Sequence, residues 1–134
     1  MRYVALCLLA VLACHNPVAV GAGREFTIAL GQRVRLAEAN LTIGFDTVTS
    51  DSRCPINMEC IAAGNAEVVL ALHPGPIAVE PPDRIVTLNT GLEPRAIPVD
   101  GYRLQLIRLD PQPIAGEPLP EPYRVTLLLA PLAP

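Results

Sequence analysis

One short stretch of the sequence gathers most of the side chains that could do chemistry, Asp51-Ser52-Arg53-Cys54-Pro55, and Cys60 follows it. The C-x5-C spacing differs from the C-x-x-C of redox enzymes, so these two cysteines suit a structural disulfide better than thiol catalysis. Ser50 and Ser52 would need a histidine base, and the chain has only His15, close to its start, and His73. The sequence therefore contains no recognisable serine-type triad, and we predict no catalytic residues.

Acidic and metal-binding side chains offer two weaker possibilities. Asp46 and Asp51 are a carboxylate pair of the kind that hydrolases use, although acids near a strand end more often cap turns. Residues 58–60 could join His73 in a soft-metal site. A lone histidine between a strand and a proline is typical of a surface residue, however, and oxidised cysteines are poor metal ligands. We predict neither a metal nor a cofactor.

The stretch around Arg53 has two interpretations. In the first it is a corner of the fold, where Asp51 and Ser52 cap a turn and Arg53 is buried, with its bonds inside residues 46–66. In the second it is an exposed recognition loop on a rigid scaffold. We favour the corner and keep the following residues as loop or binding candidates: Asp51, Ser52, Arg53, Pro55, Asn57, Met58 and Glu59.

This pattern resembles a family of small secreted or lipid-anchored bacterial domains that carry a DSRCP…C…G signature. The matching residues are Asp51-Ser52-Arg53-Cys54-Pro55, Cys60, Gly64 and Ala66, and a looser similarity extends over Phe45 to Leu129. Family members often carry an aromatic residue before the Ala-Gly pair, where this chain has Ile61-Ala62. The resemblance implies an exported β domain and no particular activity.

The first 23 residues have the features of an export signal. A short positive start precedes the apolar run Val4–Ala13, which is too short to span a membrane but suits a signal h-region. Two processing routes fit the sequence. Val11-Leu12-Ala13-Cys14 resembles a bacterial lipobox, which would make Cys14 a lipidated N-terminus. Small residues also permit ordinary cleavage before Ala22 or Gly23.

Export would also determine the state of the cysteines. Cys7 is removed on either route, and Cys14 is either removed or lipidated. Cys54 and Cys60 then form the one remaining pair in an oxidising compartment, so we predict a disulfide between them. The protein is expected to be periplasmic or anchored to the outer membrane as a lipoprotein, and otherwise secreted. Residues 24–134 have the length of a single domain.

The composition favours β structure. Fifteen prolines and nine glycines are too many for a helical bundle, because proline breaks helix interiors and is tolerated at strand ends and in loops. The net charge is -3, and a mildly acidic chain without any basic run is a poor candidate for nucleic-acid binding. We predict an all-β domain, an antiparallel β-sandwich or a small, partly open barrel of six to eight short strands.

Alternating apolar and polar residues locate the strands. Residues 25–30 and 33–37 have the pattern of a hairpin around Gly31-Gln32, and residues 41–48 continue the alternation. An irregular loop is expected over residues 49–60, and Ala66–Leu72 is apolar enough to be a central strand. Further strands are predicted over residues 84–90, 94–98, 102–110 and 123–129, with a stiff proline-rich connection over Pro111–Pro122.

These features together predict a non-enzymatic binding or assembly module of the bacterial envelope. Its partner would be an unknown envelope protein or ligand, and a lipid anchor would be its only contact with the membrane. Two alternatives stay open. A protease inhibitor would insert the disulfide-bound or proline-stiffened loop into a protease cleft, where a preorganised loop has little entropy left to lose. A small hydrolase would use carboxylates such as those named above.

Overall fold

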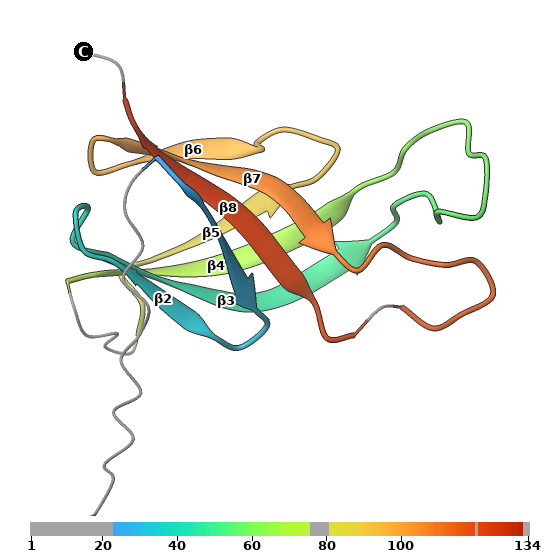
Figure 1. Cartoon of the computed structure of the whole chain (residues 1–134), viewed down its shortest axis with the longest axis horizontal. Coiled ribbons are helices and arrows are strands. Elements are labelled where there is room, and N and C mark those ends of the chain that lie inside the picture. The colour runs from blue at the N-terminus through green and yellow to red at the C-terminus, as the bar shows by residue number, and fades with distance from the viewer. Residues whose placement is uncertain (1–22, 76–80, 120, 133–134) are drawn as a thin grey trace, which may run out of the picture.

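The protein is a β-sandwich made of two antiparallel four-stranded sheets, as shown by a computed structural model that describes residues 23–75, 81–119 and 121–132 (Figure 1). One sheet has the strand order β1-β8-β7-β6 and the other β2-β3-β4-β5. The predicted all-β sandwich is confirmed. The strands are β1 (Glu25–Ala29), β2 (Arg33–Leu36), β3 (Leu41–Asp51), β4 (Ala66–Pro74), β5 (Arg84–Asn89), β6 (Ala96–Val99), β7 (Tyr102–Asp110) and β8 (Arg124–Pro131).

The hydrophobic core lies between the two sheets. Because side chains alternate between the faces of a strand, the regular parts of the strands direct every second residue toward the opposite sheet. The larger buried side chains include Ile28, Ile43, Phe45, Leu70, Leu88, Leu104, Leu106, Leu127 and Leu129. β4 pairs with both β3 and β5, which confirms the prediction of a central strand there.

The predicted hairpin of residues 25–37 is wrong in its pairing, although both of its strands exist. β1 pairs with β8 and β2 pairs with β3, so the two strands belong to different sheets. The chain does turn at Gly31-Gln32, where the N–H of Gln32 donates to the carbonyl of Ala29 (2.9 Å) and the N–H of Gly31 donates to the carbonyl of Phe45 (2.8 Å). In this arrangement Phe26 and Ile28 of β1 and Val34 and Leu36 of β2 are all buried in the core between the sheets.

Two further predictions are corrected along β3 and β4. β3 continues to Asp51 instead of ending at residue 48, with register shifts after Phe45 and after Val48. These irregularities explain why strict alternation failed as a guide there. His73 was expected at the surface but is 1% exposed, because β4 runs on to Pro74 and His73 lies opposite Thr42 within the sheet.

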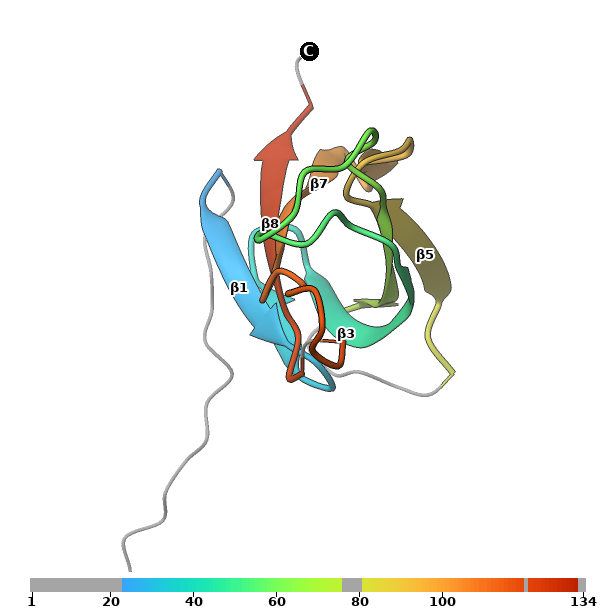
Figure 2. The same cartoon turned by 90° about the vertical axis from the view of Figure 1, so that its right-hand side faces the viewer.

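Three long connections meet at one end of the sandwich, and we call them together the loop end: residues 52–65, 90–95 and 111–123. Figure 2 looks onto this end. The described residues nearest the chain termini lie at the opposite end, where Gly23 donates to Leu129 and Leu132 donates to Gly101 (Figure 1). No helix in the described part of the chain is long and apolar enough to cross a membrane.

Candidate functional site

The carboxylate of Asp51 organises the base of the loop end. The guanidinium of Arg53 forks onto it, with Nε donating to Oδ1 (2.8 Å) and Nη2 to Oδ2 (2.7 Å). The hydroxyl of Tyr123 also donates to Oδ2 (3.0 Å). The side chain of Asp51 is 1% exposed and that of Arg53 is 11% exposed, so the pair is largely removed from solvent. Charge-assisted, two-point contacts of this kind are strong and directional.

The environment shifts the acidities of the two acidic partners in opposite directions. Burial alone would raise the pKa of Asp51, but the hydrogen bonds from Arg53 and Tyr123 and the positive charge of Arg53 outweigh burial and lower it. Burial, and then the hydrogen bond to Asp51 and its negative charge, raise the pKa of Tyr123 to about 12. Asp51 is therefore held as a carboxylate and Tyr123 as a neutral hydroxyl.

Arg53 also joins the two sheets. Its Nη1 donates to the carbonyl of Leu109 (2.6 Å) and its Nη2 to the carbonyl of Pro111 (3.0 Å), at the end of β7. The expectation that Arg53 is buried and bonded to Asp51 is confirmed. The expectation that its partners all lie within residues 46–66 is wrong, because β7 ends beside the corner and the carbonyls of Leu109 and Pro111 accept from Arg53.

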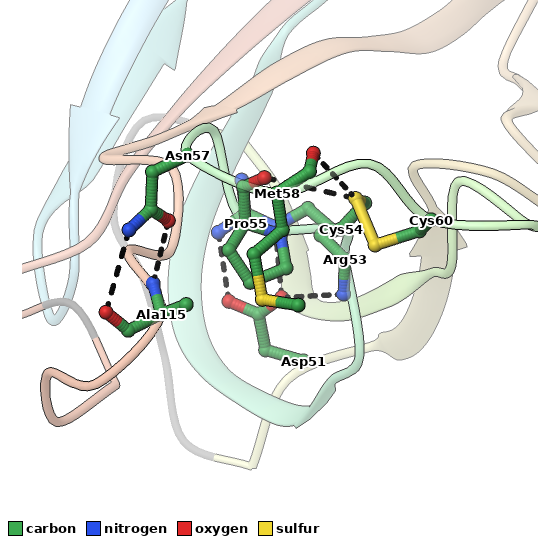
Figure 3. Close-up of a disulfide and its surroundings, with 8 residues drawn as sticks. All are labelled: Asp51, Arg53, Cys54, Pro55, Asn57, Met58, Cys60 and Ala115. Carbon is green, nitrogen blue, oxygen red and sulfur yellow. Dashed lines mark hydrogen bonds and ion pairs between the residues drawn. A yellow bond between two sulfur atoms is a disulfide. The ribbon is translucent and has the colours of Figure 1, made fainter.

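Cys54 and Cys60 form the predicted disulfide, with their Cα atoms 5.9 Å apart (Figure 3). The bridge closes the tip of residues 52–65, and the N–H of Met58 donates to the carbonyl of Pro55 (3.1 Å), so the tip contains a turn. Asn57 reaches the proline-rich loop: its Oδ1 accepts from the N–H of Ala115 (2.8 Å) and its Nδ2 donates to the carbonyl of Ala115 (3.4 Å). Figure 3 shows this two-way contact.

A second set of contacts ties the disulfide loop to residues 90–95. The Nδ2 of Asn65 donates to the Oδ1 of Asn89 (2.9 Å), and the N–H of Gly91 donates to the Oδ1 of Asn65 (2.9 Å). Asn65 and Asn89 are both buried. Sequence analysis missed this pair, since two asparagines next to glycine or threonine look like ordinary turn residues. The loop end is thus one bonded unit made of three separate connections.

The loop end exposes an unusual share of apolar side chains. Nine large apolar side chains are exposed among the described residues, and six of them belong to these three loops. The six are Ile56, Met58, Ile61, Leu92, Ile114 and Leu119. Single exposed apolar residues are normal on a protein surface, whereas large contiguous apolar patches are typical of interaction sites. Here the six side chains belong to three loops that hydrogen bonds hold together.

An open groove of about 360 Å³ lies where the disulfide loop meets residues 90–95. It is lined by Ser52, Ala62, Ala63, Gly64, Asn65, Gly91 and Leu92. Gly64 has a φ of +71°, and a Cβ there would collide with the carbonyl oxygen of Ser52. A Cβ on Gly91 would collide with the carbonyl oxygen of Gly64, so both glycines allow a close approach of two backbones.

The structure divides the candidate residues into two groups. Asp51 and Arg53 are buried parts of the corner, and Ser52 supports it by donating its hydroxyl to the carbonyl of Asn65 (2.9 Å). The residues of the tip, Asn57, Met58 and Glu59, are exposed, whereas Pro55 is half-buried. Asp46 is exposed and Asp51 is buried, so the two carboxylates do not face a common cleft. No cluster of three metal-binding side chains occurs within the described ranges.

Comparison with protein-family models, curated proteins and solved structures gives no significant match to this chain. The resemblance to domains with the DSRCP…C…G signature therefore stays a prediction, based on the residues quoted above. The case for a function depends on the geometry of the loop end.

Proposed function

We propose that this protein is a non-enzymatic binding module that docks a protein partner on its loop end. The observation that carries the proposal is the gathering of six exposed apolar side chains on three connections that hydrogen bonds and a disulfide hold together. Preorganised loops bind with a smaller loss of conformational entropy than mobile ones. Apolar side chains held on such loops can supply the buried centre of an interface.

The placement of the termini supports the same proposal. Gly23 and Leu132 lie at the end of the sandwich opposite the loop end (Figure 1). We further propose that the N-terminal segment directs export and that Cys14 carries the lipid anchor. An anchor attached through that terminus would leave the loop end directed away from the membrane and accessible to a partner.

The two alternative functions have less support. Proteases bind their substrates and many inhibitors as extended segments, whereas the tip of the disulfide loop forms a turn between Pro55 and Met58. A carboxylate-dependent hydrolase would need an accessible acid pair, but Arg53 and Tyr123 already occupy the carboxylate of Asp51.

In vivo cross-linking and capture test the proposal. The full-length protein, tagged after its last residue and exported by its native host, is compared with the variants Ile61→Glu and Ile85→Glu. Ile61 is fully exposed on the loop end, while Ile85 is 60% exposed on β5 and serves as the matched control. We expect a captured protein that is lost with Ile61→Glu and retained with Ile85→Glu. Identical captures from all three proteins, or no specific capture, would refute a docking role for the loop end.

A further inference from the structure

We propose that the groove beside Leu92 is the anchor pocket for one apolar side chain of the partner, and that basic residues flank this side chain in the partner. The inference rests on the proposed function and adds to it a defined subsite and a partner chemistry. Three observations support it: the apolar lining of the groove, the negative charges on the three loops, and the poor fit of a second copy of the chain or of an anionic lipid surface.

The lining of the groove suits an apolar side chain. Four of its seven lining residues are alanine or glycine, and another is Leu92, which is 61% exposed. The one amide side chain of the lining, that of Asn65, is already bonded to Asn89 and to the N–H of Gly91. A polar ligand would therefore find few open hydrogen-bonding partners among the side chains. The volume of about 360 Å³ is large enough for a branched aliphatic or aromatic side chain.

The charges on the loop end are mostly negative. Its three loops expose four carboxylates, those of Glu59, Glu93, Glu117 and Glu121. The guanidinium of Arg53 is neutralised by Asp51, which leaves Arg95 as the exposed base in the described part of these loops. Glu93 directly follows Leu92, so negative charge lies next to the groove. Complementary charge around an apolar centre steers association and selects the partner, which here must carry lysine or arginine beside its apolar anchor.

The same charges disfavour two other occupants. Two copies of this chain joined through their loop ends would place four carboxylates opposite four others, and like charges in an interface oppose association. An anionic lipid surface would be repelled for the same reason. The groove and its charges thus fit a protein segment with basic residues.

Selection from a random peptide library displayed on phage tests the inference, with the exported protein immobilised through its C-terminal end. We expect the enriched peptides to combine a large apolar residue with lysine or arginine within a few positions. Binding of the best synthetic peptide should fall at least about tenfold with Leu92→Glu and with Ala62→Phe, which narrows the groove from the other loop. It should also weaken with Glu93→Lys and at high salt, because exposed charges are screened.

Matched controls complete the design. Ile85→Glu adds the same charge at equal exposure on β5, and Glu25→Lys makes the same charge change at the opposite end, so neither should alter binding. Failure to enrich any peptide, enrichment of acidic peptides, or binding unchanged by both groove variants would overturn the inference. Concentration-dependent dimers abolished by Leu92→Glu would overturn it in favour of a second copy. If the cross-linked partner depends on Ile61 but not on the groove variants, the inference fails while the proposed function stands.

Discussion

The carboxylate of Asp51 shows how one residue can hold several elements together. It lies at the last position of β3 and accepts hydrogen bonds from Arg53, two residues later, and from Tyr123, next to the start of β8. Arg53 in turn donates to two carbonyls where β7 ends. A buried charge needs such compensation, because an uncompensated one is strongly unfavourable in a protein interior.

We expect Arg53→Ala to destabilise the protein by about 3 kcal/mol, because it leaves a buried carboxylate without its cationic partner and two carbonyls without their donor. Urea unfolding measures this difference. Arg108→Ala is the matched control. Arg108 likewise pairs with an aspartate two positions away, Asp110 (2.9 Å), but both of these side chains are exposed. The control should cost less than about 1 kcal/mol. Equal losses for the two variants would contradict a structural role for the buried pair.

The shifted acidities predict a pH dependence at both extremes. The pKa of Asp51 is lowered from 3.8, so its stabilisation is present above that pH and is lost as the pH falls through the lower, folded value. The pKa of Tyr123 is raised from 10.0 to about 12, so its stabilisation is complete below pH 10 and is lost as the pH rises toward 12. The stability advantage of the wild type over Tyr123→Phe should therefore shrink between pH 10 and pH 12. A constant difference across this range, in urea titrations, would contradict the assignment.

At the scale of elements, the loop end depends on connections that come from different parts of the fold. The disulfide loop joins β3 to β4 within one sheet, while the proline-rich loop joins β7 to β8 in the other. Asn57 bonds to Ala115 between them, and Ile56 donates to the carbonyl of Pro113 (3.0 Å). These bonds hold the two loops together at one end of the sandwich, and both loops carry exposed apolar side chains.

Replacing both Cys54 and Cys60 with serine should cost about 2 kcal/mol, because the bridge closes a short loop and removes only a small conformational entropy from the unfolded chain. The loss of the disulfide should make the loop of residues 54–60 more mobile and leave the sheet unchanged. Hydrogen exchange should show faster exchange for residues 54–60 and little change in β3 and β4. Free thiols on both cysteines in the protein isolated from its host, at full stability, would contradict this role.

Gly64→Ala should destabilise the protein by more than about 2 kcal/mol, because the new Cβ collides with the Ser52 carbonyl and the backbone φ is +71°. The variant Gly116→Ala is the control that measures the cost of a positive φ without a steric collision. Gly116 has a φ of +85°, but nothing lies within 4 Å of its added Cβ, so this variant should cost about 1 kcal/mol. Thermal melts of both variants measure the difference. Similar losses would show that the approach of Gly64 to Ser52 is not tight.

At the scale of the whole molecule, the described residues nearest the two chain ends lie opposite the loop end. Gly23 begins the described domain at the end opposite the loop end (Figure 1). This polarity suits a protein that is attached to a surface at one end and binds a partner at the other. The charge distribution agrees with this arrangement, since the loop end would avoid an anionic lipid surface.

The proposed lipid anchor is tested by Cys14→Ser. With the anchor, the wild-type protein should fractionate with membranes, because two or more acyl chains give stable binding. The variant should either lose processing or appear in the soluble fraction. Mass spectrometry of the wild type provides the check on the same sample. An unmodified N-terminus at Ala22 or Gly23 would contradict lipidation.

Local patterns were sufficient to predict much of this protein. Alternation located most of the strands, because the side-chain period of a strand is a property of a few consecutive residues, and a continuous apolar run located the central strand at Ala66–Leu72. The number and spacing of the cysteines, together with the predicted export, predicted the Cys54–Cys60 bridge. Short-range chemistry predicted that Arg53 would bond to Asp51, since the two are only two positions apart.

Contacts between distant parts of the chain could not be obtained in this way. Arg53 meets Leu109 across 56 positions, Asn57 meets Ala115 across 58, and Tyr123 meets Asp51 across 72. The assignment of β1 and β2 to different sheets could not be predicted either, because alternation identifies a strand without identifying the strand it pairs with. The packing of the two sheets determines which segments become neighbours. It therefore brings three loops, with their apolar side chains and carboxylates, to one end of the sandwich.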